Sequence, residues 1–332
     1  TGKPKGTMHF HRDVIAMSDC FPRSIMKMHK DDIVCGTPPL AFTFGLGGML
    51  CFPMRYGAST VLVEKHTPET LLETIQRFKC NTLFTTPIMY RQMAALARQF
   101  DLRSLKNCVS AGEALPDPTR QVFKDATGIE IIDGIGSTEM FHIFISHTRE
   151  RVRRGATGYA IPGYKATVLD EEGRECQAGQ IGKLAVKGPT GCRYLADDRQ
   201  LNYVKNGWNV TGDAYVRDDD GYFFYQARTD DMIISAGYNI AGPEVEAALL
   251  AHPAVAECGV VGWPDEERGT IVKAFVVLKP ENPKSDEMKK ALQEHVKQAI
   301  APYKYPRAVE FIDSLPRTET GKVRRFKLRK DA

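Results

Sequence analysis

The chain has 332 residues, about twice the common size of a single domain, so we expect two or more domains with a substantial hydrophobic core. Apolar residues make up 42% of the chain and charged residues 26%, values typical of folded globular proteins that exclude disordered, collagenous and coiled-coil classes. The formal net charge of +4 comes from the end of the chain, because residues 317–332 carry seven basic and two acidic side chains. A broad nucleic-acid-binding surface is therefore not expected, and the basic end alone is interpreted as a solvated terminus.

The cysteine spacing and the longest uncharged run bear on where the protein resides. Eight cysteines lie far apart without a C-x-x-C pair, which argues against the usual metal and redox patterns and favours reduced thiols. Residues 33–54 are long enough to span a membrane, but three prolines and four glycines would break a spanning helix, so we expect buried loop and strand there. The chain opens on a loop with neither an initiator methionine nor a visible secretion leader. We therefore expect a cytoplasmic protein without a membrane partner, and a chain that lacks the first part of a longer protein.

The first part of the chain alternates between strand-like and helical patterns. Short apolar runs bounded by turn residues predict strands over 32–36, 60–63, 81–84, 107–110 and 130–133. Amphipathic stretches predict helices over 67–78 and 88–99. This alternation is typical of an α/β layer with a mainly parallel sheet, which we assign to residues 1–150.

Two other patterns follow. In residues 151–228, glycine and aspartate separate short strands, which predicts a small antiparallel barrel or sandwich with strands over 165–169, 182–186 and 221–225. A polar cluster then marks a domain boundary at 229–231. Residues 229–332 predict a separate α+β domain, with a helix from about Pro243, strands near 258–261 and 272–278, and a charged helix over 285–300.

Two common glycine motifs for nucleotides are absent. The opening segment Thr1–Gly6 combines glycine with lysine, as a phosphate-binding loop does, but it does not fit the pattern G-x-x-x-x-G-K-[ST]. The glycine pairs that begin at Gly45 and Gly134 lack the third glycine of the dinucleotide fingerprint. Taken alone, each of these segments favours a simple turn.

The segment from Asp133 to Glu139 combines two glycines, two hydroxyls and a carboxylate at the end of a predicted strand. Glycine lets a ligand approach the backbone, Ser137 and Thr138 can donate to phosphate oxygens, and Glu139 can bind a hard cation such as Mg²⁺. A nucleoside triphosphate would use all three features. A helix capped by Ser137 or Thr138, with Glu139 in its first turn, fits the same residues nearly as well.

Three polar segments farther along the chain are also candidates. Asp213 can accept two hydrogen bonds from a ribose diol, and Arg228 can donate to the same hydroxyls. The loop from Pro316 to Lys322 has a glycine hinge and presents one lysine. Each segment alone is ordinarily a turn or a surface lysine.

Taken together and in order, these segments resemble the adenylate-forming acyl-CoA ligase family, and most closely the aryl-CoA ligases of the benzoate and 2-aminobenzoate type. The resemblance rests on residues 1–6, 110–113, 133–144, 211–213, 225–239 and 316–322. It implies an α/β fold in which a large adenylate-forming domain, here without its N-terminal half, combines a parallel α/β layer with a small β-barrel and precedes a small mobile α+β domain. It also implies a two-step reaction, in which a carboxylate attacks the α-phosphate of Mg-ATP and CoA then displaces AMP from the acyl adenylate.

The resemblance assigns roles to individual residues. The ATP and AMP site would comprise Thr1, Gly2, Lys3, Lys5, Gly6, Gly112, Glu113, Asp133, Gly134, Ser137, Thr138, Glu139, Asp213 and Arg228, with Glu139 as the Mg²⁺ ligand. Lys322 would be the catalytic lysine of adenylation and Asp230 the hinge of the mobile domain. The CoA tunnel would be lined by Ala236, Gly237 and Tyr238. The aromatic carboxylate would lie against Phe44, Ala111, Gly136, His142 and Ile143.

Alternatives to an aryl-CoA ligase remain at this stage. Without the resemblance, Phe44, His142 and Ile143 would be interpreted as ordinary core residues. A ligase for a small aliphatic acid and a non-catalytic, nucleotide-binding protein use the same motifs. The expected ligands are ATP, CoA and a small aromatic carboxylate, with no nucleic acid and no membrane, and with a homodimer left open.

Overall fold

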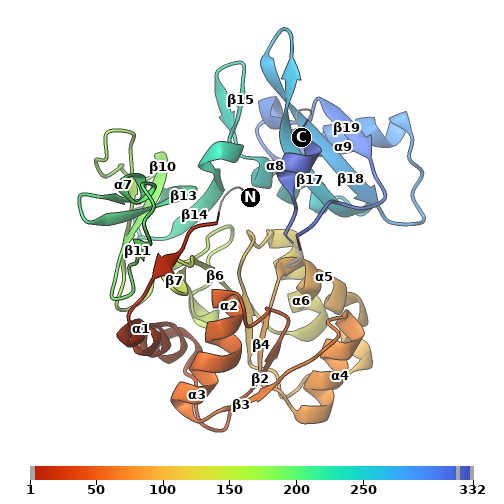
Figure 1. Cartoon of the computed structure of the whole chain (residues 1–332). Coiled ribbons are helices and arrows are strands. Elements are labelled where there is room, and N and C mark those ends of the chain that lie inside the picture. Colours follow the sequence, from red (N-terminus) through yellow and green to blue (C-terminus); the bar gives the residue numbers. More distant parts are fainter. Residues whose placement is uncertain (1–3, 319–321, 330–332) are drawn as a thin grey trace. The chain divides into compact units, whose positions relative to one another are not determined.

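The computed structural model describes residues 4–318 and 322–329, so the predicted ligands Thr1, Gly2 and Lys3 lie outside the described residues. The chain divides into two compact units, shown in Figure 1. The first contains residues 1–115 and 119–225, and the second contains residues 116–118 and 226–332. The predicted division into domains at 150/151 and 228/229 stays a prediction.

The first unit is built on a seven-stranded sheet. In spatial order the strands are β3 (Ser59–Val61), β2 (Ile33–Gly36), β4 (Thr82–Thr85), β5 (Asn107–Ser110), β6 (Ile131–Gly136), β7 (Ile143–Ser146) and β8 (Tyr159–Ala160). The first five strands are parallel, and β7 and β8 continue the sheet antiparallel. The predicted α/β layer with a mainly parallel sheet is confirmed.

Helices cover both faces of this sheet, because its strands are apolar on both sides. Neighbouring residues such as Ile131 and Ile132 belong to different core clusters. One face packs against α4 (Pro68–Phe78), α5 (Pro87–Leu96) and α6 (Asp117–Thr127), and the other against α1 (His11–Phe21) and α3 (Phe52–Tyr56). Helix α4 begins where predicted, since the Thr67 hydroxyl accepts from the Thr70 N–H at 3.2 Å, and it ends at Lys79 in the left-handed region.

The uncharged segment 33–54 was predicted to be buried loop and strand, and the structure differs from this prediction. Only β2 is a strand, and residues 43–56 form a continuous helical stretch of α2 (Thr43–Gly45), the π-helix η2 (Leu46–Cys51) and α3. The glycines in this stretch allow close packing rather than breaking the helix. A Cβ on Gly45 would lie 2.2 Å from the Pro39 carbonyl oxygen, and one on Gly47 would lie 2.4 Å from the His142 ring.

An antiparallel β subdomain follows the large sheet. Its five strands are β9 (Lys165–Leu169), β10 (Ile181–Lys187), β12 (Val204–Lys205), β13 (Trp208–Arg217) and β14 (Phe223–Arg228), with β13 pairing β10, β12 and β14. A separate short ladder joins β1 (Thr7–Met8) to β11 (Arg193–Tyr194). Val168, Leu184 and Tyr215 extend from the subdomain into the main core of the first unit.

The second unit is a small α+β fold. Its three-stranded sheet has the order β17 (Val255–Asp265), β18 (Gly269–Leu278) and β19 (Ala308–Phe311), and a separate hairpin pairs β15 (Ile233–Ser235) with β16 (Tyr238–Ile240). Helices α8 (Gly242–Leu250) and α9 (Asp286–Ala299) contribute Val245 and Leu292 to its core. Ser285 caps α9 by accepting from the Met288 N–H at 3.2 Å.

Two predictions about thiols and membrane spans can be compared with the structure. All eight cysteines are free thiols, in agreement with the absence of a C-x-x-C pair. Among residues 4–318 and 322–329, no helix combines the length and the apolar composition needed to cross a bilayer.

Gly47 provides a test of the packing around His142. Gly47→Ala should lower the free energy of unfolding by about 1–3 kcal/mol, because the added methyl collides with a buried ring. Urea denaturation measures this difference. The control is Gly191→Ala, whose Cβ would lie 3.2 Å from the side chain of Asn209 and can be accommodated by its movement. Equal effects of the two substitutions would contradict the packing argument.

Candidate active site

A short β-ladder carries the opening loop to the site. Thr7 and Met8 of β1 pair with Tyr194 and Arg193 of β11. The Leu195 N–H donates to the carbonyl of Gly6 at 2.8 Å and continues the ladder. Lys5 therefore lies beside Tyr194, although 189 positions separate the two residues in sequence.

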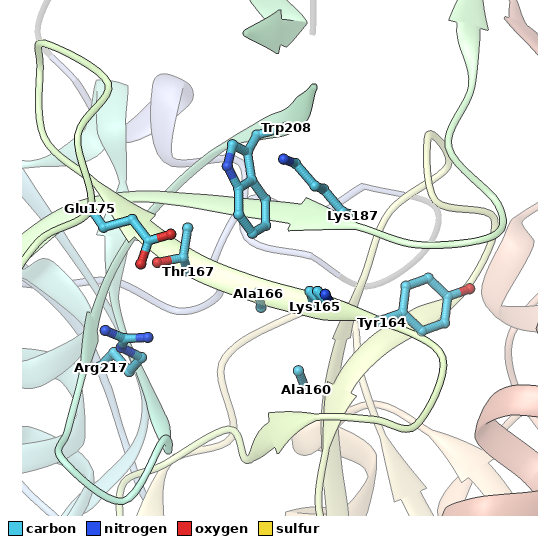
Figure 2. A pocket seen from close by; sticks show the side chains of 9 residues that line it. All are labelled: Ala160, Tyr164, Lys165, Ala166, Thr167, Glu175, Lys187, Trp208 and Arg217. Atoms are coloured by element: carbon cyan, nitrogen blue, oxygen red, sulfur yellow. The ribbon is translucent and has the colours of Figure 1, made fainter. Parts of the chain in front are cut away.

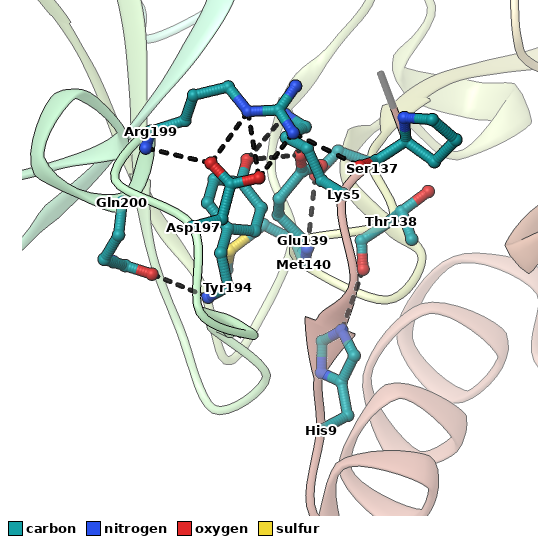
Figure 3. A network of polar contacts seen from close by, with 11 residues as sticks. Lys5, His9, Ser137, Thr138, Glu139, Met140, Tyr194, Asp197, Arg199 and Gln200 are labelled. Carbon is teal, nitrogen blue, oxygen red and sulfur yellow. Dashed lines mark hydrogen bonds and ion pairs between the residues drawn. The ribbon is translucent and has the colours of Figure 1, made fainter.

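Lys5, Glu139 and Tyr194 form a closed polar triangle, drawn in Figure 3. The Lys5 ammonium lies 3.0 Å from Glu139 Oε1 and 2.8 Å from the Tyr194 hydroxyl. The Tyr194 hydroxyl donates to the same Glu139 oxygen at 2.6 Å. The ammonium also lies 4.5 Å from the centre of the Tyr194 ring, within reach of a cation–π interaction. Two of the predicted triphosphate-site residues, Lys5 and Glu139, are thus in direct contact.

The segment around Glu139 is a turn between two strands, so the alternative prediction of a helix here is wrong. Strand β6 continues to Gly136, and β7 begins at Ile143. The Ser137 hydroxyl accepts from the Met140 N–H at 3.1 Å, which tightens the turn. Phe141 adopts a φ of 71°, in the left-handed region that non-glycine residues seldom enter. This turn holds Thr138 and Glu139 at the carboxyl end of β6.

His9 supports the same turn from the opening segment. Its Nε2 lies 2.8 Å from the Thr138 carbonyl oxygen, and its Nδ1 lies 3.3 Å from Asp13 Oδ2 (Figure 3 shows the first contact). The ring packs against Phe141 at a centroid distance of 4.6 Å. His9 therefore connects α1 to the turn that carries Glu139.

The electrostatics of the triangle favour an ionised Glu139. Burial raises the pKa of this carboxyl, but hydrogen bonds from Tyr194, a backbone N–H and Lys5 outweigh it, so the pKa is lowered overall. In the described part of the chain, no group of three or more His, Cys, Asp or Glu residues could hold a metal ion. Glu139 still fits Mg²⁺, because this ion is commonly bound by one or two carboxylates together with substrate phosphates and water. Thr138, on the same turn, could bind a phosphate oxygen.

Asp133 lies within the same strand, where it pairs with Ser110 at the end of β5, and is buried with 6% of its surface exposed. Among the described residues, its Oδ1 has no hydrogen-bond partner, which leaves an acceptor for a ligand. Burial raises the pKa of Asp133 to about 7, and the nearby Arg120 guanidinium offsets only part of this effect. Gly112 follows the neighbouring strand β5 with a φ of 94°, a conformation that favours glycine.

A buried network that sequence reasoning missed surrounds Asp133. Arg120 donates to Glu130 Oε1 and to the Ile131 carbonyl, each at 2.7 Å. His147 Nε2 accepts from the Asp133 N–H at 3.2 Å, so its Nδ1 carries the proton and donates to the Thr148 carbonyl at 3.0 Å. Burial and Arg120 lower the pKa of His147 to about 4, so the ring is neutral. No motif in the sequence marks Arg120 or His147.

The predicted aromatic-acid residues come together on the core side of β5, β6 and β7. Ala111 and Ile143 belong to the main core cluster, and Phe44 packs against it. The ring of His142 lies 5.9 Å from Phe44 and 4.5 Å from Phe52, while a Cβ on Gly136 would lie 2.6 Å from the His142 carbonyl. Neither ring nitrogen of His142 has a hydrogen bond of ordinary geometry, and burial lowers its pKa to about 3. These residues form an apolar, aromatic corner around His142, whose neutral ring provides its polar atoms.

The remaining predicted ligands lie on separate elements. Asp213 lies in β13, where its N–H donates to the Thr211 hydroxyl at 3.2 Å. In the second unit, Arg228 ends β14 and its Nε lies 3.6 Å from Asp230 Oδ1. Glu113 follows Gly112 in the loop after β5 and is partly exposed.

The second unit presents the predicted CoA and catalytic residues on turns. Ala236 and Gly237 have φ values of 48° and 82° and join β15 to β16 as a two-residue hairpin turn. Tyr238, directly after this turn, is exposed and packs against Tyr303. Lys322 is exposed in a loop closed by the Thr318 N–H, which donates to the Lys322 carbonyl at 2.9 Å.

Two surface cavities lie in the first unit. The larger, of 590 Å³, is lined by Trp208, Lys187, Lys165, Arg217 and Glu175 among others, as shown in Figure 2. The smaller, of 330 Å³, includes Tyr194 and lies next to the triangle. Neither includes the aromatic corner around His142.

Asp133 predicts a pH dependence of stability. Because its pKa in the folded protein lies above that of an unfolded aspartate, its contribution to stability is present at acidic pH and is lost as the pH rises towards 7. Between about pH 4 and pH 7 the wild type should lose stability relative to Asp133→Asn, by up to about 1.4 kcal/mol per pH unit. Urea unfolding of both proteins across this range measures the difference, with Asp31→Asn as the exposed control. Parallel pH profiles for wild type and Asp133→Asn would contradict the assignment.

Comparison with known proteins identifies the family. The profile of the AMP-binding enzyme family matches residues 1–194, and the profile of the AMP-binding enzyme C-terminal domain matches residues 244–322. Benzoate–CoA ligase from Thauera aromatica is 41% identical and covers 99% of this chain, which spans 64% of that protein. The crystal structure of the anthranilate CoA ligase AuaEII with anthranoyl-AMP superposes with a TM-score of 0.94 at 40% identity, covering 98% of this chain and 64% of that one. A benzoate CoA ligase from Burkholderia xenovorans gives a TM-score of 0.90 at 36% identity, covering 98% of this chain and 67% of that one. The chain, which spans just under two thirds of its first relatives, belongs to the AMP-binding enzyme family.

Proposed function

We propose that this chain supplies the nucleotide site and the catalytic lysine of an ATP-dependent aryl-CoA ligase. The observation that carries the proposal is the contact between Lys5 and Glu139, since it brings an ammonium that could bind phosphate next to a carboxylate that could bind Mg²⁺, just beyond the end of a parallel strand. The similarity to benzoate–CoA and anthranilate–CoA ligases supports the same reaction class.

In the first step, a carboxylate oxygen of the substrate attacks the α-phosphorus of ATP, and pyrophosphate leaves. Lys5 would bind the β- and γ-phosphates, and Ser137 and Thr138 would donate to phosphate oxygens. Mg²⁺ at Glu139 would neutralise phosphate charge during this step. Lys322 would lie at the junction of the carboxylate and the α-phosphate, where two anions approach each other and a cation stabilises the transition state.

In the second step, the CoA sulfur attacks the acyl carbonyl carbon, the thiol proton is lost and AMP leaves. Ala236, Gly237 and Tyr238 would line the path of the pantetheine arm. Asp230 would be the hinge about which the C-terminal domain turns between the two steps. The hairpin turn at Ala236 and Gly237 supports the proposed path of the pantetheine arm, because it exposes backbone without bulky side chains.

Adenosine would be bound by residues at the ends of the strands. Asp133 supports an adenine contact, because its unpartnered Oδ1 can accept from an exocyclic amino group. Gly112, Glu113 and Gly134 would border the base. Asp213 and Arg228 would bind the ribose hydroxyls.

An aromatic carboxylate is the proposed substrate, with 2-aminobenzoate and benzoate as the first candidates. Phe44, His142 and Ile143 offer flat apolar surfaces, while Gly136 and Ala111 leave room beside them. The similarity to a benzoate–CoA ligase and to an anthranilate (2-aminobenzoate) CoA ligase supports this choice. We further propose a role in the catabolism of aromatic compounds in the cytoplasm.

Lys322→Ala should lower the rate of adenylation about a thousandfold, because it removes the cation from the meeting point of two anions. Thioester formation from supplied aroyl adenylate and CoA should change much less. Pyrophosphate release and CoA consumption measure the two half-reactions separately, using the chain together with any further part that the gene encodes. Lys327→Ala, which removes another exposed lysine of the same unit, should leave both rates unchanged. Equal losses in both half-reactions of Lys322→Ala would refute the assignment.

A panel of acids tests the substrate class. Pyrophosphate release should be fastest with 2-aminobenzoate or benzoate, and at least tenfold slower with acetate, because acetate leaves most of the apolar corner without contacts. A preference for acetate or another aliphatic acid would replace the aryl proposal with an aliphatic acyl-CoA synthetase. Binding of ATP without pyrophosphate release for any acid would indicate a non-catalytic, nucleotide-binding protein.

A further inference from the structure

Tyr194 is the one member of the polar triangle that the proposed reaction does not use. Its side chain is 3% exposed and its ring packs against Tyr203 at a centroid distance of 5.2 Å. Together with Cys192, these two tyrosines form a small buried cluster of their own. The hydroxyl of Tyr194 is therefore held at a defined position between Lys5 and Glu139.

The backbone of Tyr194 is fixed as firmly as its ring. Tyr194 pairs with Thr7 across the β1–β11 ladder. The Tyr194 N–H donates to Gln200 Oε1 at 2.7 Å, as Figure 3 shows. Arg199 adds a hydrogen bond to the Pro4 carbonyl at 3.2 Å. The loop before β1 is thus tied to the segment around Tyr194 on both sides of Lys5.

The proton count fixes the direction of each hydrogen bond in the triangle. An ionised carboxylate only accepts, and an ammonium only donates. The single hydroxyl proton of Tyr194 therefore goes to Glu139, and its oxygen accepts from Lys5. Lys5 uses two of its three N–H groups on Glu139 and Tyr194, and within residues 4–318 and 322–329 no other partner of its ammonium is seen, so the third could donate to a phosphate oxygen.

We propose that Tyr194 is a positioning residue for the triphosphate, whose hydroxyl shares the Glu139 carboxylate with Lys5 and so keeps the ammonium and the carboxylate correctly aimed for the phosphates and their metal ion. This inference rests on the proposed function. Without the hydroxyl, Glu139 loses its shortest hydrogen bond and its remaining strong partner is Lys5. The existing ion pair between Lys5 and Glu139 would then lose the hydroxyl that both groups share. Lys5 would compete more strongly with the metal ion for the carboxylate, and Glu139 would compete more strongly with phosphate for the ammonium.

A purely structural role is the alternative, since Tyr194 also packs a buried cluster. Tyr194→Phe separates the two roles, because phenylalanine keeps the ring, its stacking on Tyr203 and the cation–π contact with Lys5. The matched control is Tyr222→Phe in the same unit. Tyr222 is also buried, its hydroxyl donates to the Arg151 carbonyl at 3.1 Å, and the Arg153 guanidinium lies 4.1 Å from its ring centre.

The experiment compares ligands with and without the β- and γ-phosphates. Isothermal titration calorimetry would measure dissociation constants for ATP in the presence of Mg²⁺ and for AMP. Tyr194→Phe should raise the constant for Mg-ATP about tenfold and change that for AMP less than about twofold, since one charge-assisted hydrogen bond is lost only at the triphosphate end. Tyr222→Phe should change neither constant by more than about twofold. Equal weakening of both ligands in Tyr194→Phe, or no weakening of either, would overturn the proposal.

A second measurement separates this inference from the proposed function. If the wild type bound neither ATP nor AMP, the proposed function would fail on its own account. The coupling between Tyr194 and Glu139 would then be measured from the free energies of unfolding in urea of Tyr194→Phe, Glu139→Gln and the double variant. Non-additive effects support the bridging role of the hydroxyl, and additive effects overturn it.

Discussion

The candidate site depends on one short antiparallel ladder between β1 and β11. Each strand has two residues, yet the pairing brings together a lysine from the start of the chain, a tyrosine about 190 positions later and a glutamate from the turn after β6. The Lys5 ammonium, on a side chain that is 35% exposed, donates hydrogen bonds to a carboxylate and a hydroxyl. The ladder therefore positions Lys5, and the contact between Lys5 and Glu139 in turn connects the ladder to the turn after β6.

The parallel sheet supplies the second constraint. Since β5 and β6 are parallel neighbours, Gly112 and Glu139, which follow them, emerge at the same edge of the sheet. Asp133 lies within β6 and pairs with Ser110, the last residue of β5, which places it in the same region of the first unit. The sheet is buried on both faces, and its buried polar groups include the small network of Arg120, Glu130 and His147 beside that edge. A ligand that offers both an aromatic base and phosphates matches the chemistry exposed there.

Local patterns predicted most of the fold, and long-range contacts account for what they missed. The strands β2, β4, β5 and β6 and the helices α4 and α9 follow from apolar runs and caps that act within a few residues. The helical stretch 43–56 was missed, because its glycines were interpreted as helix breakers. In the structure, Gly45 and Gly47 allow close contacts with Pro39 and His142, and no local pattern in the sequence reveals these contacts. Tyr194, Arg120 and His147 were missed for the same reason, since their partners lie on other elements and no spacing in the sequence reveals them.

The two units provide positive charge in different ways. Lys5 is committed to Glu139 and Tyr194, and its side chain is 35% exposed, so it is held where phosphates would bind. Lys322 is exposed in the second unit, beside hydrogen bonds that link Thr318 to Lys322 and Arg324 to Pro316. An exposed ammonium keeps its hydration and adds little to stability, so moving it would cost little free energy. The two-step reaction proposed above, in which Lys322 would act in adenylation alone, agrees with this exposure, because a lysine buried by its own unit could not leave its place between the steps.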